Sequence, residues 1–270
     1  MKKQELITNI YKKKSVLTIG LDTDFEAIPA HLQKLGLEKG IIAFNKQIIE
    51  ATASHCVAYK INTAFYEQYG QIGWQLMAET LAFIPKDIFT IADAKRGDIG
   101  NTSKMYAKAF FDTLTFDAIT VAPYMGSDSI LPFLSYSEKW IIVLALTSNQ
   151  GSNDLQNHLL ANGKKVYEHS MEQTAKLGSD SNIMFVTGAT KASSLQEIRN
   201  QFPNHFFLVP GVGAQGGSAQ EVCKAAFIPN QAGLLINSSR GIIYASNLPN
   251  FAEKAKDAAK NINKETLHFF

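Results

Sequence analysis

The sequence predicts an α/β protein with a TIM (β/α)8 barrel, and three observations favour this fold. Apolar strand-like segments alternate with segments of helical periodicity about eight times along the 270 residues. The strand-like segments are almost continuous apolar runs, which is typical of a parallel sheet that is covered on both faces. Eight such units in about 250 residues match the usual size of this barrel. A doubly wound open sheet is the alternative architecture.

The expected strands are short runs of mainly apolar residues, rich in β-branched and aromatic side chains. In chain order they cover residues 16–22, 56–62, 87–95, 118–123, 140–148, 183–189, 206–212 and 233–240. Each run ends in polar residues, glycine or proline. Because a barrel brings the carboxyl ends of its strands to one mouth, these strand ends are where we expect a functional site.

Between the strands, apolar residues recur at helical spacing, as Ile41, Phe44 and Ile48 do. The expected helices cover residues 2–13, 36–53, 64–83, 101–113, 127–134, 164–177, 191–201, 218–226 and 249–259. The polar segment 149–162 is expected to be a loop. No change of composition marks a linker, so residues 1–270 are expected to form one barrel domain with a short leading helix.

Composition excludes several classes of function. The 26 basic and 24 acidic residues leave a net charge of +2, which does not favour a nucleic-acid partner. The sequence lacks an apolar run of about 18 residues and an apolar signal segment, so no membrane partner is expected. Cys56 and Cys223 lie far apart in apolar surroundings and are expected to be free, buried thiols. Such thiols suit a reducing compartment, so we expect a cytoplasmic protein.

The segment 93–102 carries the densest functional signal. Its sequence, Asp-Ala-Lys-Arg-Gly-Asp-Ile-Gly-Asn-Thr, lies between an apolar strand and a predicted helix. Residues two apart on a strand share a face, so Asp93 and Lys95 are expected to be neighbours at the barrel mouth. Asp98 lies in the following loop and can face the same pocket or another subunit. The alternative is a solvated charge cluster in which Asp98 or Asn101 caps the helix.

Other strand ends supply further polar groups. In chain order the strand-end residues are Asp22, Lys60, Asn62, Asp93, Lys95, Pro123, Thr147, Ser148, Gly188, Pro210, Gly211, Ser239 and Arg240. A metal held by Asp22 and Asp93 is conceivable, but the neighbouring lysines would place cations where the metal would sit. No histidine ends a strand, so a nucleophilic triad around Ser148 is not supported.

The last two strands lead into a predicted phosphate site. Residues 210–217 are rich in glycine and open onto a helix, whose N-terminus favours an anion. Arg240 adds a guanidinium group after the eighth strand. Phosphate sites after strands 7 and 8 recur in this barrel fold. The alternative is that residues 210–217 form ordinary glycine-rich turns.

Together these motifs resemble the orotidine 5′-phosphate decarboxylase family, in particular its longer bacterial subgroup, type 2. The matching segments are 20–22, 59–62, 93–102, 146–149, 210–217 and 238–241. They follow the order of the family along almost the whole barrel. Related sugar-phosphate enzymes share the Asp-x-Lys-x-x-Asp core, whereas the Gly-Gln loop and the terminal arginine make the combination specific. The segment 149–165 is longer than in compact members of the family.

The resemblance implies a lyase that decarboxylates orotidine 5′-phosphate to uridine 5′-phosphate and CO2, the last step of UMP biosynthesis, without a metal or cofactor. It implies that Lys95 stabilises the C6 carbanion and protonates it. The implied catalytic network consists of Lys60, Asp93, Lys95 and Asp98. The implied substrate contacts are Asp22, Thr102, Ser148, Pro210, Gln215, Ser239 and Arg240. In the homodimer that the resemblance implies, Asp98 and Thr102 cross the interface to the other subunit's site.

Two other functions are alternatives. A related sugar-phosphate decarboxylase or aldolase would share the Asp-x-Lys-x-x-Asp core but would need a divalent metal and further acidic ligands. Lys60 stands at the second strand end, where such an acid would be required. A nucleotide-binding protein without catalysis would not need an ammonium group such as that of Lys95 beside two acids.

Overall fold

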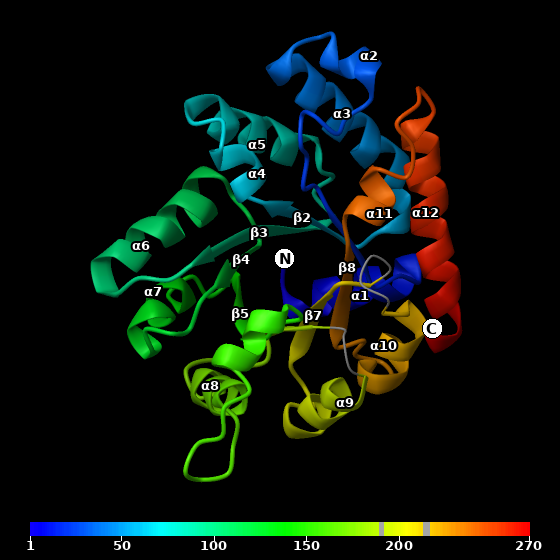
Figure 1. The fold of residues 1–270 in the computed structure, drawn as a ribbon. Coiled ribbons are helices and arrows are strands. Elements are labelled where there is room, and N and C mark those ends of the chain that lie inside the picture. Colours follow the sequence, from blue (N-terminus) through cyan, green and yellow to red (C-terminus); the bar gives the residue numbers. More distant parts are fainter. Residues whose placement is uncertain (189–191, 213–216) are drawn as a thin grey trace.

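The computed structural model describes residues 1–188, 192–212 and 217–270. Its eight strands form a closed barrel in chain order, and every neighbouring pair is parallel, including β1 with β8 (Figure 1). The strands are β1 (Leu17–Gly20), β2 (Ala58–Asn62), β3 (Phe89–Arg96), β4 (Ala118–Val121), β5 (Trp140–Leu146), β6 (Ile183–Thr187), β7 (Phe206–Pro210) and β8 (Leu234–Ser238). The predicted TIM barrel is confirmed, and the open sheet is excluded.

Helices surround the strands and connect each strand to the next (Figure 1). The α-helices are α1 (Lys3–Lys13), α2 (Ala30–Gln33), α3 (Leu37–Thr52), α4 (Ala64–Glu67), α5 (Gln71–Phe83), α6 (Gly100–Lys108), α7 (Leu131–Leu134), α8 (Val166–Ala175), α9 (Ala192–Gln201), α10 (Ala219–Ala226), α11 (Arg240–Ile243) and α12 (Phe251–Thr266). Four segments are 3-10 helices: η1 (Ala53–His55), η3 (Ser127–Ser129), η4 (Gln150–Asp154) and η5 (Leu267–Phe269). The remaining segment, η2 (Ala109–Thr113), is a π-helix that directly continues α6. No helix of the described ranges is long and apolar enough to cross a membrane.

Several predicted element bounds were wrong. The single helix expected over 64–83 is divided into α4 and α5, because Gly70 adopts a φ of 60° between them. Gly73 then lies so close to α4 that a Cβ on it would come within 1.7 Å of the Tyr66 carbonyl oxygen. The segment expected to be a loop, 149–162, contains η4, and the last long helix continues to Thr266.

The amino-terminal end of the barrel is closed by aromatic side chains and by the start of the chain. Trp140 contacts Phe89 at 6.1 Å and Phe206 at 5.8 Å between ring centroids, edge to face in both pairs. The Trp140 Nε1 donates to the Met1 carbonyl oxygen at 2.9 Å, and the Met1 ammonium binds Asp117 at 2.6 Å. In Figure 1 the N-terminus accordingly lies near the middle of the strand ring. These contacts tie the start of the chain to the amino-terminal end of the barrel.

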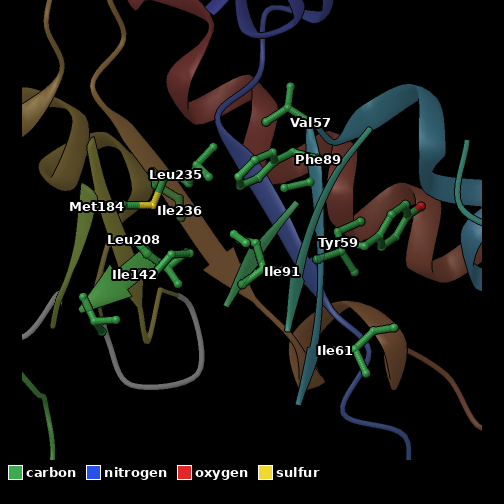
Figure 2. Packing of buried hydrophobic residues seen from close by; sticks show 14 of the residues in the cluster. Val57, Tyr59, Ile61, Phe89, Ile91, Ile142, Met184, Leu208, Leu235 and Ile236 are labelled. Atoms are coloured by element: carbon green, nitrogen blue, oxygen red, sulfur yellow. The ribbon is translucent and has the colours of Figure 1, made fainter. Parts of the chain in front are cut away.

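Above this aromatic layer the barrel interior is filled by branched and sulfur-containing side chains. Ile91, Ile142, Met184 and Leu208 come from β3, β5, β6 and β7, and each is at most 3% exposed (Figure 2). Such layers, built from different strands, make the barrel a packed core rather than a pore. They form a rigid floor for the residues at the carboxyl ends of the strands.

Candidate active site

A cavity of about 340 Å³ opens at the carboxyl ends of the barrel strands. It is lined by Asp22, Lys60, Asn62, Asp93, Lys95, Leu144, Thr147, Ser148, Asn149, Val186, Leu208, Pro210, Gly211, Val212, Asn237, Ser238, Ser239 and Arg240. Most of the site residues expected from the sequence therefore meet in one cavity. Its volume is within the usual range for a small-molecule site.

The two sides of this cavity differ in chemistry. Strands β1 to β3 and the loops after them contribute charged groups, among them those of Lys60 and Asp93. Strands β5 to β7 contribute the apolar side chains of Leu144, Val186 and Leu208. A ligand in the cavity would thus contact charges on one side and hydrocarbon on the other, where charge–charge interactions are less screened by water.

Asp93 is the centre of the charged side. One of its oxygens, Oδ2, accepts a hydrogen bond from the Lys60 ammonium at 2.7 Å, and the other, Oδ1, accepts one from the Lys95 ammonium, also at 2.7 Å. Lys60 also lies 3.6 Å from Asp22 Oδ1. The structure therefore joins four predicted residues, Asp22, Lys60, Asp93 and Lys95, into a chain of alternating charges.

Burial and neighbouring charges act in opposite directions on this chain. Burial alone would lower the pKa of Lys60, but Asp93 and Asp22 outweigh it and raise that pKa. Burial alone would raise the pKa of Asp93, but Lys60 and Lys95 hold it well below its usual range. Both groups are thus charged at neutral pH. The Lys60 side chain is only 6% exposed whereas that of Lys95 is 50% exposed, so Lys95 is the more accessible ammonium.

Two tyrosine hydroxyl groups, which the sequence did not indicate, hold the backbone at Asp22. The hydroxyl of Tyr66 donates to the Leu21 carbonyl oxygen at 3.1 Å, and that of Tyr244 donates to the Asp22 carbonyl oxygen, also at 3.1 Å. Asn45, which is fully buried in α3, donates to the Tyr66 hydroxyl at 3.0 Å. In the sequence, the only sign of this support is a polar residue, Asn45, within the apolar helical pattern of Ile41 and Ile48.

Ser148 lies just after β5, at a position supported from two directions. The backbone N–H of the preceding Thr147 donates to Gln156 Oε1 at 2.8 Å, and Gln156 belongs to the long segment 149–165. On the other side, a Cβ built on Gly188 would come within 2.9 Å of the Ser148 backbone nitrogen. The long segment therefore anchors the end of β5.

The predicted phosphate site is described in part. Pro210 ends β7, and Ser239 and Arg240 lie at the start of α11 rather than at the end of a strand, because β8 stops at Ser238. All three line the cavity. Gln215 and the other residues of 213–216 lie outside the described residues.

Asp98 and Thr102 do not line the cavity of their own chain. Asp98 Oδ1 accepts the backbone N–H of Ile99 at 2.7 Å, and Thr102 lines a separate surface pocket with Ile99, Asp128 and Leu131. Ile99, rather than Asp98 or Asn101, occupies the N-cap position of α6, so the proposed side-chain cap of that helix is wrong.

Several apolar side chains of α6, α7 and the adjoining loops are exposed, and two of them, Ile99 and Leu131, share the surface pocket of Thr102. Ile99, Met105 and Leu131 are 52%, 46% and 46% exposed, and Tyr124 and Met125 in the loop after β4 are 83% and 49% exposed. Such a cluster beside α6 and α7 is typical of a protein interface. Within the described residues, no group of three or more His, Cys, Asp or Glu side chains is arranged to hold a metal ion.

Comparisons with known proteins show similarity over almost the whole chain. The family model "Orotidine 5′-phosphate decarboxylase / HUMPS family" matches residues 16–255. The orotidine 5′-phosphate decarboxylase of Phocaeicola vulgatus is 52% identical over 268 residues, which are 98% of this chain and 97% of that protein. The solved structure of Leishmania donovani OMP decarboxylase is 34% identical, with a TM-score of 0.82, and the match covers 98% of this chain and 99% of that one.

The solved Leishmania donovani UMP synthase is 36% identical, again with a TM-score of 0.82. That match covers 97% of this chain but only 56% of the synthase. The resemblance drawn from the sequence motifs is confirmed by the full-length matches. The chain belongs to the orotidine 5′-phosphate decarboxylase / HUMPS family.

Proposed function

We propose that this protein decarboxylates orotidine 5′-phosphate to uridine 5′-phosphate and CO2, the last step of UMP biosynthesis. The observation that carries the proposal is the Lys60–Asp93–Lys95 chain, which places two ammonium groups on one carboxylate in a half-apolar cavity. Full-length relatives named orotidine 5′-phosphate decarboxylase support the same reaction.

The chemistry requires positive charge at one atom. When the bond between C6 and the carboxylate breaks, the electron pair stays on C6, and the pyrimidine ring offers no nearby sink for it. A fixed ammonium group can stabilise that charge without reorganisation of solvent. We assign this role to Lys95, which then gives a proton to C6 and recovers one from water.

Asp93 has two roles in the proposal. Its charge beside the departing carboxylate disfavours the bound substrate relative to the state after CO2 has left. Its Oδ1 also accepts a hydrogen bond from the Lys95 ammonium and so holds the proposed proton donor in place. Lys60 holds the second oxygen of Asp93 and fixes its orientation.

The remaining residues bind the substrate. We propose that Asp22 and Lys60 contact the ribose and that Ser148 contacts the base. Arg240 and Gln215 hold the phosphate, with Pro210 and Ser239 beside them. Contacts to the phosphate, far from C6, supply binding energy that can orient the pyrimidine ring for reaction.

We propose further that the enzyme is a homodimer in which Asp98 and Thr102 reach the partner subunit's cavity. Two observations support this arrangement: neither residue lines its own cavity, and the exposed side chains of Ile99 and Leu131 share a surface pocket with Thr102. Mixing inactive Lys95→Ala with inactive Asp98→Ala should restore up to about a quarter of wild-type activity, because one site of each hybrid dimer is intact. No recovery after verified subunit exchange would contradict the shared site.

The decisive experiment follows the absorbance of orotidine 5′-phosphate with purified protein in the presence of a chelator. Turnover in the wild type and its loss in Lys95→Ala are expected. Turnover that the chelator abolishes would instead favour a metal-dependent sugar-phosphate enzyme. Binding of the nucleotide without turnover would favour the non-catalytic alternative.

Two broader proposals accompany this function. We propose that residues 1–270 act as one domain, because α1 and the Met1 terminus pack against the same barrel that carries the site. We also propose a cytoplasmic location, because Cys56 and Cys223 are both buried and free, as suits a reducing compartment.

A further inference from the structure

Thr120 lies inside the barrel on β4, one residue before the strand ends, and it is fully buried. It is not among the residues that line the cavity. Its hydroxyl nevertheless forms hydrogen bonds with two residues of the charged network, Lys95 and Asp93. The oxygen accepts the backbone N–H of Lys95 at 2.9 Å, and the hydroxyl donates to Asp93 Oδ1 at 3.0 Å.

The backbone of β3 is irregular at this point. Ala92 pairs with Ile119 and Arg96 pairs with Val121, so residues 93–95 lie opposite Thr120 alone. Lys95 absorbs the extra length with a φ of 46°, in the left-handed region that residues other than glycine rarely adopt. Asp93 and Lys95 are therefore neighbours for a reason other than the regular alternation of strand faces, since the strand is bulged between them.

The direction of both hydrogen bonds is determined by their partners. The Lys95 N–H can only donate, so the Thr120 oxygen must accept, and its single hydrogen remains for the Asp93 carboxylate. The bulge removes the Lys95 N–H from the strand ladder, and the hydroxyl is what satisfies it. Without that hydroxyl, the Lys95 N–H would lose its acceptor and Asp93 Oδ1 would lose one of its two hydrogen-bond donors.

We propose that Thr120 is a positioning residue of the decarboxylation reaction. Its hydroxyl holds the bulged backbone of Lys95 and the Asp93 carboxylate in one arrangement, so that the Lys95 ammonium stays on Oδ1 and faces the reacting carbon. This inference rests on the proposed function. It assigns to Thr120 an effect on the chemical step and not on substrate binding, because the side chain lies outside the cavity lining.

The test compares two variants of Thr120 with a matched control. Thr120→Val keeps the shape but removes the hydroxyl, and Thr120→Ser restores it. The control is Thr18→Val, since Thr18 is also fully buried inside the barrel but its hydroxyl has no hydrogen-bond partner in the described part of the chain. For each variant, kcat, KM, the Kd of uridine 5′-phosphate and the melting temperature are measured.

In Thr120→Val, kcat should fall about 100-fold, the size of effect expected when a catalytic group is misplaced by about 1 Å. KM and the Kd of uridine 5′-phosphate should stay within about threefold of the wild type, because the substrate contacts remain. Thr120→Ser should recover most of kcat, and Thr18→Val should match the wild type. Unchanged kcat in Thr120→Val would overturn the proposal, as would a folded Thr120→Ser that is no better than Thr120→Val.

Failure of the proposed function is distinguishable from failure of this inference. Absence of turnover in the wild type would reject the proposed function. An active wild type and an inactive Lys95→Ala, together with a fully active Thr120→Val, would reject only the role of Thr120. A crystal structure of Thr120→Val gives a reading that does not depend on turnover. The Lys95 ammonium is expected to leave Asp93, and an unchanged contact at 2.7 Å with Lys95 still left-handed would overturn the inference.

Discussion

Gly20, the last residue of β1, lies directly against Ser239 at the start of α11. A Cβ built on Gly20 would come within 1.9 Å of the Ser239 Oγ and 2.9 Å of the Ser239 Cβ. Rotation of the serine side chain could relieve the first contact but not the second. Because residue 20 has no side chain, Ser239 can pack against β1. A larger residue there would displace Ser239, and with it Arg240, from their positions at the cavity.

The variant Gly20→Ala should raise KM for orotidine 5′-phosphate about tenfold, equivalent to about 1.4 kcal/mol of lost binding. The reason is that a shift of the start of α11 displaces the proposed phosphate contacts but not Lys95. Steady-state kinetics gives the result, and kcat should fall by a smaller factor than kcat/KM. A KM equal to that of the wild type would show that the backbone near Ser239 adjusts without loss.

Asp93→Asn should destabilise the fold by about 3 kcal/mol at pH 7, because it removes the carboxylate between two ammonium groups. The pKa of Asp93 is held well below its usual range in the folded chain, so its contribution is fully present above the unfolded pKa of about 4. Below that pH the unfolded chain takes up a proton while the folded chain resists, and the contribution declines as the pH falls through the folded pKa.

Urea unfolding of both proteins at pH 7, 5, 4 and 3 measures this difference. The advantage of the wild type over Asp93→Asn should be the same at pH 7 and 5 and smaller at pH 3. An advantage that stays constant down to pH 3 would mean that the charge of Asp93 does not stabilise the folded state.

Gln156→Ala should weaken substrate binding about fivefold, equivalent to about 1 kcal/mol, because the side chain loses its hydrogen bonds to Thr147. The Gln156 side chain holds the backbone of Thr147, and Ser148 follows directly. The matched control is Asn153→Ala, an exposed residue of η4 in the same segment. If KM rises equally in both variants, the effect belongs to the segment as a whole and not to the Gln156 contact.

Arg199→Ala should lower the free energy of unfolding by about 4 kcal/mol, as expected when a buried hydrogen-bonding network is broken. The buried guanidinium donates to the carbonyl oxygens of four residues and lies 3.8 Å from the ring centroid of Phe207. Those four residues are Ala226, Phe202, His205 and Gly233.

Equilibrium urea unfolding is the measurement for Arg199→Ala, with kcat at low temperature as the control for an intact site. Arg199→Lys, which keeps the charge but not the planar fork, should recover only part of the loss. A loss below about 1 kcal/mol in Arg199→Ala would contradict the assigned role, because four buried carbonyl groups would then have found other donors.

Local patterns in the sequence were enough to predict the barrel and most of the site. Apolar runs mark strands wherever they lie, and polar residues at their ends mark the mouth because parallel strands all end there. For this reason Lys60, Asp93, Ser148 and Arg240 were expected at the cavity, and they line it. The same local reasoning failed for residues 64–83, where the close approach of Gly73 to Tyr66 depends on packing between α4 and α5.

The tertiary structure alone decided which distant groups hold these residues. Thr120 and Lys95 are 25 residues apart, and Asn45 and Tyr66 are 21 apart, so no local pattern links either pair. The left-handed backbone of Lys95 is likewise set by pairing with β4, since only the closed barrel places Thr120 opposite residues 93–95. The sequence by itself thus determined the fold and which charged groups reach the mouth. Their orientation depends on buried partners that come together only when the barrel closes.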